Sequence, residues 1–232
     1  MNDTIATLLT PVTLLGRTVL SFVAKLGGLF IFLTKGLVQI GRPPSALGKV
    51  VQQVYFIGVK SIFVIVLIGL FTGMVLGLQG YYTLVKFGSE GLLGAAVALS
   101  IIRELGPVLT AIMITGRAGS SMAAEIGIMR ISEQIDALST MDIDPMRFLI
   151  APRLAASLLC FPLLTAIFDV VGILGGYLTG VVLLGINPGV YFDRIDATVE
   201  LTDVTGGFTK ALVFALLVAT ISCYEGYFTH TR

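Results

Sequence analysis

The feature that most constrains this chain is an uncharged run between Lys60 and Lys86. At about 1.5 Å of rise per helical residue, this run can cross the roughly 30 Å hydrocarbon core of a bilayer. The composition agrees, because 56% of the 232 residues are hydrophobic and only 12% are charged. The mean hydropathy of +0.97 also exceeds what a water-soluble domain needs. The sequence therefore predicts an all-α integral membrane protein.

Three more apolar stretches predict further transmembrane spans, at residues 91–115, 154–192 and 208–228. The first of these contains Arg103 and Glu104, and the second contains Asp169 as its single charged residue. The second stretch allows one long helix or a hairpin. One long helix is favoured because the first clear turn signal is the Asn-Pro-Gly sequence at residues 187–189. A polar, largely acidic loop is expected over residues 193–203.

The region before Lys60 differs, since basic residues are spread through its apolar sequence and Pro43 and Pro44 interrupt it. Such a helix is expected to lie along the membrane interface, with apolar side chains buried and basic side chains reaching toward water. A first transmembrane span at residues 26–40 is the alternative. The expected organisation is one domain over residues 1–232, with an interfacial helix region at 1–48 and a bundle of four transmembrane helices at 49–232.

Basic residues in short loops predict the orientation. The N-terminal region is basic, and the connection over residues 116–153 contains Arg117, Arg130, Arg147 and Arg153, whereas the connections near Lys86 and Arg194 contain one basic residue each. The N-terminus and the 116–147 loop are therefore expected to face the cytoplasm.

Arg103 and Glu104 stand side by side within a predicted span. A charge near the bilayer centre costs about 2.5–3.5 kcal/mol on insertion scales and usually faces a bundle interior or a water-filled cavity. Neighbouring helical residues point about 100° apart, so at least one of the two should meet a cavity or another chain. Pro107 should bend the helix and free backbone carbonyls. The alternative is a structural ion pair at the lipid–water boundary.

Glycines recur every fourth residue on two of the predicted spans. This spacing aligns them on one face and allows another helix to approach closely, although glycine is also simply frequent in membrane helices. The two series are Gly69, Gly73 and Gly77, and Gly172, Gly176 and Gly180.

Familiar catalytic motifs are absent from the sequence. There is no phosphate-binding loop, no nucleophile elbow and no zinc-protease motif, and the single histidine is His230. Cys160 and Cys223 have no metal-ligand spacing, and a net charge of +1 gives no field for nucleic acid. We expect no catalytic residues, metal, cofactor or nucleic-acid partner.

The 116–147 loop has helical character, because apolar residues recur in it at mostly helical spacings among charged ones. They are Ile126, Met129, Ile131, Ile135 and Leu138. An amphipathic helix at a membrane surface can dock a cytosolic partner, although a solvated surface helix looks the same. Asp144 and Pro145 are expected to end it.

Five motifs in order give the chain a family resemblance. They are GMVLGLQGY (73–81), RELGPVLTA (103–111), GRAGSSMAAEIGIMR (116–130), EQIDAL (133–138) and DPMRFLIAPR (144–153). Together, over about residues 45–230, they resemble the MlaE-type permeases, the membrane subunits of ABC transporters associated with MCE proteins. Members of this family usually continue beyond the position of Arg232 with one final span, so a fifth span is expected in the family.

The resemblance implies a function and a set of partners. Such permeases are non-enzymatic homodimers in the bacterial inner membrane, where they move glycerophospholipids between inner and outer membranes and so maintain outer-membrane lipid asymmetry. They bind cytosolic ABC ATPase subunits, in some systems with a STAS-domain accessory protein, and a periplasmic hexamer of MCE domains.

The resemblance also implies two sites. A coupling helix within about residues 123–142 fits a groove on the ATPase, and its candidate contact residues are Glu125, Arg130, Glu133 and Asp136. An outward-open pocket at the dimer axis binds lipid, and its candidate lining residues are Leu76, Gln79, Leu84, Phe87, Glu104 and Leu105. The match is weaker at Leu84 and Phe87, because the sequence after Tyr81 departs from the motif.

Two other classes of function compete with this reading. An ion-coupled secondary transporter would use Glu104 and Asp169 as titrating carriers, but the inverted repeats that favour this class are not visible. An intramembrane enzyme acting on lipid would need a nucleophile and a base that the sequence does not supply.

Overall fold

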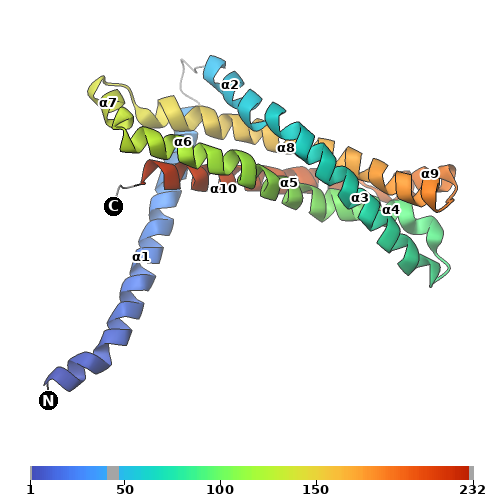
Figure 1. Ribbon diagram of the computed structural model, residues 1–232, viewed down its shortest axis with the longest axis horizontal. Coiled ribbons are helices and arrows are strands. Elements are labelled where there is room, and N and C mark those ends of the chain that lie inside the picture. The colour runs from blue at the N-terminus through green and yellow to red at the C-terminus, as the bar shows by residue number, and fades with distance from the viewer. Residues whose placement is uncertain (1, 41–46, 230–232) are drawn as a thin grey trace.

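The computed structural model describes residues 2–40 and 47–229, with side chains from residue 16 onward. These residues are almost entirely helical and contain no strand (Figure 1), which confirms the all-α prediction. The helices are α1 (Asn2–Ile40), α2 (Leu47–Ile57), α3 (Ile62–Val85), α4 (Leu93–Ser100), α5 (Gly106–Ile114), α6 (Ser120–Ile131), α7 (Gln134–Thr140), α8 (Ala151–Tyr177), α9 (Pro188–Thr198) and α10 (Leu201–Tyr227).

Five described helical stretches are long and apolar enough to cross a membrane, at Gly16–Ile40, Leu47–Val85, Glu90–Ile131, Met146–Leu183 and Leu201–Tyr227. The last four lie alongside one another as an elongated bundle (Figure 1), so the four predicted bundle spans are confirmed. The second of these spans joins α4, α5 and α6 through π-helical segments at Ile101–Leu105 and Thr115–Gly119.

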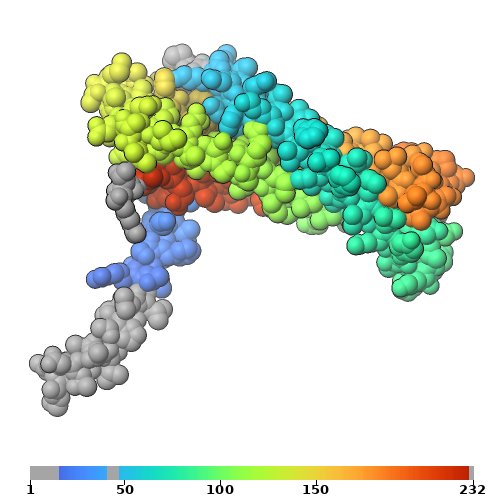
Figure 2. Space-filling view, viewed as in Figure 1, coloured from blue at the N-terminus to red at the C-terminus, as the bar shows by residue number. Residues whose placement is uncertain are grey.

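The first apolar stretch, in α1, does not lie alongside the other four, and it contacts the bundle only near its C-terminal end. Figure 2 shows the described part of α1 standing away from the bundle at the end where α7 lies. Near this junction Phe32 is buried and Gly36 faces the side chain of Leu154. Length and apolarity allow α1 to span a membrane, and the interfacial position of this helix stays a prediction. The expected break at Pro43 and Pro44, like His230, lies outside the described residues.

Close contact between the α3 and α8 backbones organises the bundle. A β-carbon on Gly73 would overlap the carbonyl oxygen of Gly172, and a β-carbon on Gly175 would overlap that of Leu70. The predicted glycine packing is therefore confirmed for these two spans. Gly180, the third member of the second series, faces Leu93 of α4.

Buried apolar residues form two clusters. The larger one fills the space among α3, α4, α5, α8 and α10, and includes Ile65, Ile101 and Phe168. The second lies at the α7 end of the bundle and joins α1, α6, α7, α8 and α10. Its fully or nearly buried members are Phe32, Ile126, Ile135, Leu149, Ile150, Leu154, Ala219 and Cys223.

Two element boundaries differ from the prediction. The long helix over residues 154–192 is confirmed as far as Leu183, but the expected loop at 193–203 is largely helical. In α9, the Asn187 side chain accepts a hydrogen bond from the Gly189 N–H, which caps the helix. Tyr191 is buried in α9, its hydroxyl donates to the Ile173 carbonyl at 3.1 Å, and burial raises its pKa to about 12. A helical cap and one buried aromatic anchor thus order a polar sequence.

The glycine contact gives a stability prediction. Gly73→Ala should lower the free energy of unfolding by about 1–3 kcal/mol, because the added methyl group meets backbone atoms of α8 that cannot move separately. Gly206→Ala on α10 is the matched control, since a β-carbon there meets no atom within 4 Å. Thermal unfolding of both variants in detergent measures the difference. Equal melting temperatures for the two would contradict the contact.

Candidate functional site

Arg103 and Glu104 of the second span both pair with residues of α10. Arg103 donates from Nε and Nη2 to Asp203 Oδ1 at 2.7 and 2.6 Å, and Lys210 Nζ lies 2.6 Å from Glu104 Oε1. The alternative prediction of structural ion pairs is therefore correct as far as pairing goes. The two side chains nevertheless remain 54% and 68% exposed on this single subunit, so they also face its surroundings.

Pro107 explains why Lys210 is held at this place. Because proline has no N–H, the carbonyl of Arg103 lacks its usual helical donor. Lys210 Nζ donates to this carbonyl at 2.8 Å as well as to Glu104. The expectation of a freed carbonyl is confirmed, whereas Lys210 and Asp203 were not identified as its neighbours. The signal that could have indicated Lys210 is a base inside a predicted span.

The other predicted lipid-lining residues are divided between the core and the surface. Leu76 and Leu84 are half-buried and pack against the larger apolar cluster, and Leu105 is also half-buried. Gln79 is exposed and Phe87 is 77% exposed. Among the described residues, no hydrogen bond or ion pair connects Gln79 with Glu104. A lipid pocket lined by these six residues therefore stays a prediction.

Asp169 is separate from these ion pairs. It lies on α8, half-buried, and its Oδ1 is buried without a hydrogen-bond partner among the described residues. This oxygen occupies the space that a β-carbon on Gly106 would fill. The glycine directly before Pro107 thus makes room for a carboxyl group against the second span.

The segment at residues 123–142 is not one coupling helix. α6 ends at Ile131, Glu133 adopts a left-handed backbone with φ of 57°, and α7 then begins at Gln134. The change of direction has a physical reason, because it places Ile135 in the apolar cluster at the α7 end of the bundle. The single-helix expectation is therefore wrong, and the segment is a helix–turn–helix.

Three of the four predicted coupling residues are engaged in ion pairs within the chain. Arg130 Nη1 lies 2.7 Å from Asp136 Oδ1, and Arg153 Nη2 lies 2.8 Å from Glu125 Oε2. Glu133 is exposed and has no side-chain partner among the described residues. It stands at the turn between α6 and α7, where its charge is available to another molecule.

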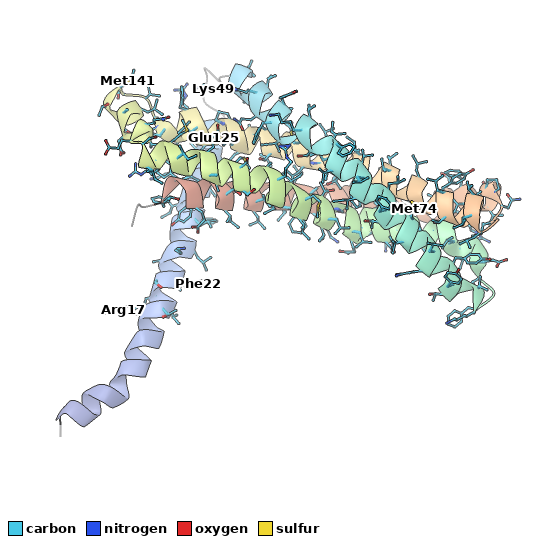
Figure 3. The ribbon with its side chains drawn as sticks, viewed as in Figure 1. Arg17, Phe22, Lys49, Met74, Glu125 and Met141 are labelled. Carbon is cyan, nitrogen blue, oxygen red and sulfur yellow. The ribbon has the colours of Figure 1, made fainter. Side chains whose placement is uncertain are left out.

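Exposed apolar side chains lie on both sides of this turn along the chain. Ile128, Ile131 and Met141 are all exposed, and Figure 3 shows Met141 at the outer end of α7, beyond Glu125. An exposed apolar set beside an unpaired acid is the composition of a protein-docking surface. We call Ile128, Ile131, Glu133 and Met141 the α7 surface.

Arg117 has a structural role that the sequence did not reveal. It lies in the π-helical segment Thr115–Gly119, and its Nη2 donates to the carbonyl of Phe56 near the end of α2. Its guanidinium carbon is 5.3 Å from the centroid of the Phe56 ring. Arg117 therefore supports the break between α2 and α3. The sequence signal that could have indicated this role of Arg117 is its position between two small residues, Gly116 and Ala118, in a long helix.

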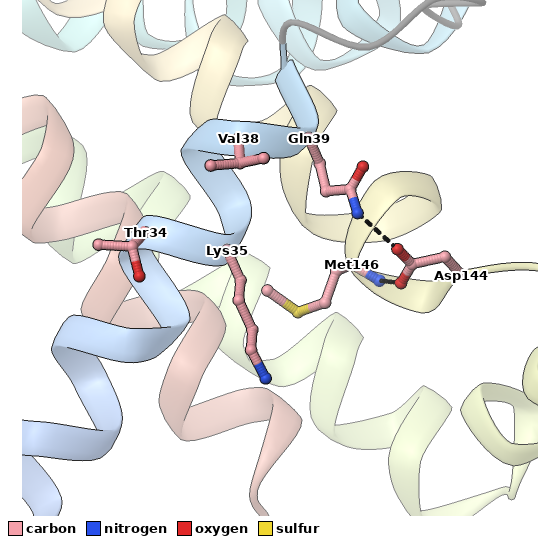
Figure 4. A pocket seen from close by; sticks show the side chains of 6 residues that line it. All are labelled: Thr34, Lys35, Val38, Gln39, Asp144 and Met146. Carbon is pink, nitrogen blue, oxygen red and sulfur yellow. Dashed lines mark hydrogen bonds between the residues drawn. The ribbon is translucent and has the colours of Figure 1, made fainter.

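A cavity of about 470 Å³ lies away from all of these groups. It separates the end of α1 from the turn before α8, and Figure 4 shows Gln39 donating to Asp144 across it at 2.8 Å. The lining residues are Thr34, Lys35, Val38, Gln39, Asp144 and Met146. Its open shape and its mixed lining identify a seam between α1 and the bundle and not the predicted lipid pocket.

Comparison with known proteins identifies the family. The family model for the permease MlaE matches residues 50–232. The chain is 42% identical over 217 residues to the intermembrane phospholipid transport system permease protein MlaE of Haemophilus influenzae, covering 93% of this chain and 83% of the relative. It is 40% identical over 214 residues to a probable ABC transporter permease protein of Rickettsia felis, covering 92% and 83%.

A plant relative is also similar. The chloroplastic protein TRIGALACTOSYLDIACYLGLYCEROL 1 of Arabidopsis thaliana is 35% identical over 178 residues, covering 77% of this chain and 51% of the relative. The family model matches residues 50–232, the part of the chain that forms the bundle described above. The chain belongs to the MlaE permease family.

Proposed function

We propose that this protein is the multi-pass permease subunit of an ABC transporter that moves glycerophospholipids between the inner and outer membranes of a bacterium. The observation that carries the proposal is the 42% identity over 93% of the chain to an intermembrane phospholipid transport permease. The helical bundle and the exposed ion pairs of the second span support it. The subunit resides in the inner membrane, and a partner ATPase hydrolyses the ATP.

The lipid-binding site forms between two copies of the chain. Arg103 and Glu104 are exposed on one subunit, and charges that faced hydrocarbon there would be costly. A second copy placed against this face would enclose a polar region that can receive a phosphate headgroup, while apolar side chains contact the acyl chains. Glu104 and Lys210 supply the polar part of this site. Its other members are Leu76, Gln79, Leu84, Phe87 and Leu105.

The α7 surface binds the ATPase. Its exposed isoleucines and Met141 supply apolar contact, and the unpaired carboxylate of Glu133 supplies a charge for a basic partner residue. Arg130 and Asp136 hold the turn in shape through their ion pair. A STAS-domain accessory protein on the ATPase and an MCE-domain hexamer at the opposite end of the bundle complete the assembly.

Ion coupling is the alternative, and the buried, unpaired oxygen of Asp169 is the observation that favours it. An ionisable side chain inside a membrane-spanning helix is a candidate for ion or proton transfer. Membership of an ABC permease family favours ATP as the energy source. In the proposed function Asp169 therefore carries no ion, and its role is to pack against Gly106.

The Glu104–Lys210 pair should be needed for lipid handling. Glu104→Gln is expected to lower the phospholipid transport rate by on the order of tenfold, because a charge-assisted hydrogen bond to Lys210 is lost. Glu90→Gln, in the connection after α3, is the matched control. Transport by the reconstituted complex and mass spectrometry of retained lipid measure the effect. Dissociation of the permease dimer in Glu104→Gln would show instead that Glu104 is architectural.

The α7 surface should govern ATPase binding. Glu133→Lys is expected to weaken co-purification of the ATPase about fivefold or more, because a rim charge is reversed. Asp196→Lys on α9, at the opposite end of the bundle (Figure 1), should leave co-purification unchanged. Full ATPase retention by Glu133→Lys would contradict docking at this turn.

Asp169 distinguishes the two energy sources. Asp169→Asn removes the titratable group and keeps the side-chain shape, so ATP-driven lipid transport should stay within about twofold of wild type, the scale of a near-isosteric change. Transport is measured in proteoliposomes with ATP and no ion gradient. Loss of transport in a folded Asp169→Asn complex, together with transport by wild type driven by a gradient alone, would support ion coupling.

A further inference from the structure

Arg153 is a buried cation at the start of α8 that the proposed mechanism has not used. Its side chain is only 5% exposed. Nη1 donates to the Leu149 carbonyl at 2.9 Å, and Nη2 donates to Glu125 Oε2 at 2.8 Å. Nε is buried and has no partner among the described residues. Glu125 is therefore the single carboxylate that pairs with this guanidinium within the described chain.

The two partners of this ion pair are held very differently. Arg153 lies in the tightly packed wall of α8, whereas the Glu125 side chain is 54% exposed. A buried guanidinium needs a carboxylate partner, because an unpaired charge in the interior is strongly unfavourable. A half-exposed glutamate has water as an alternative partner. The pair therefore fixes the position of Glu125, and with it α6, relative to α8.

The ion pair lies on the path between the α7 surface and the membrane-spanning helices. Glu125 is on α6, which leads directly into the turn at Glu133. Ile126, next to Glu125, and Leu154, next to Arg153, belong to the apolar cluster that also holds Ile135 of α7. Beyond this cluster, α8 contacts the α3 backbone through its glycines. Direct contacts thus connect α7 with α8, and α8 with α3, through this junction.

We propose that Arg153 is a positioning residue for energy coupling, which clamps Glu125 so that α6 and α8 move as one body when the ATPase pushes on the α7 surface. This inference rests on the proposed function. It changes the role expected for Glu125, which becomes an internal link of the permease and not a contact to the ATPase. Different residues then bind the ATPase and transmit its movement. Glu133 contacts the ATPase, and the Arg153–Glu125 pair transmits the movement from α6 to α8.

The test uses the complete transporter with its ATPase in proteoliposomes, and its readout is phospholipid moved per ATP hydrolysed. Glu125→Ala should lower this ratio about fivefold or more, the lower end of coupling between two sites, while ATPase co-purification and hydrolysis persist. Glu125→Gln retains an acceptor for Arg153 and should lower the ratio less. Glu225→Ala is the matched control, because Glu225 forms an exposed 3.5 Å pair with Lys25, and its ratio should equal that of wild type.

Several outcomes would overturn the inference. One is an unchanged ratio in an assembled Glu125→Ala complex, and another is loss of ATPase binding by folded Glu125→Ala permease, since Glu125 would then be a docking contact. If Glu125→Ala does not assemble, Glu125→Gln decides: a reduced ratio supports the clamp, and a wild-type ratio refutes it. Failure of the proposed function gives a different result, namely no ATP-dependent lipid movement by the wild-type complex.

Discussion

The backbone contact between α3 and α8 is the constraint on which the other features depend. Lipid gives helices no hydrophobic reason to associate, so close van der Waals packing has to supply the attraction. Gly73 and Gly172 meet without side chains between them, which fixes α8 as the centre of the bundle. Asp169 and Arg153 are carried on this same helix, and their surroundings follow from its placement.

Charges inside the bundle are accommodated by local changes in the helices and by partners on other helices. One π-helical segment contains Arg103 and Glu104, and another contains Arg117. A third ends shortly before Arg153. Such segments shift side-chain direction and release backbone groups, and they occur frequently at functional sites. At Arg103 the freed carbonyl is satisfied by Lys210, so the cost of the proline is offset by the same side chain that pairs with Glu104.

The division between docking and transmission could be predicted only in part. The amphipathic spacing of apolar residues located the α6–α7 region, and the family resemblance pointed to its acids, of which Glu133 and Asp136 are exposed. The sequence did not show that Glu125 pairs with Arg153 or that Arg130 pairs with Asp136. Charged residues in one motif look equivalent in a sequence, because their partners are chosen by packing.

The sequence alone determined the helical spans, since helix length, apolarity and glycine spacing act within one segment and do not depend on its neighbours. The tertiary structure decided what the charged residues do. Arg103 and Asp203 are 100 positions apart, and no local rule brings α10 beside the second span. Whether a charge is paired, exposed or clamped depends on which helix approaches it, because a Coulomb interaction depends on the distance between two groups in space and not on their separation along the chain.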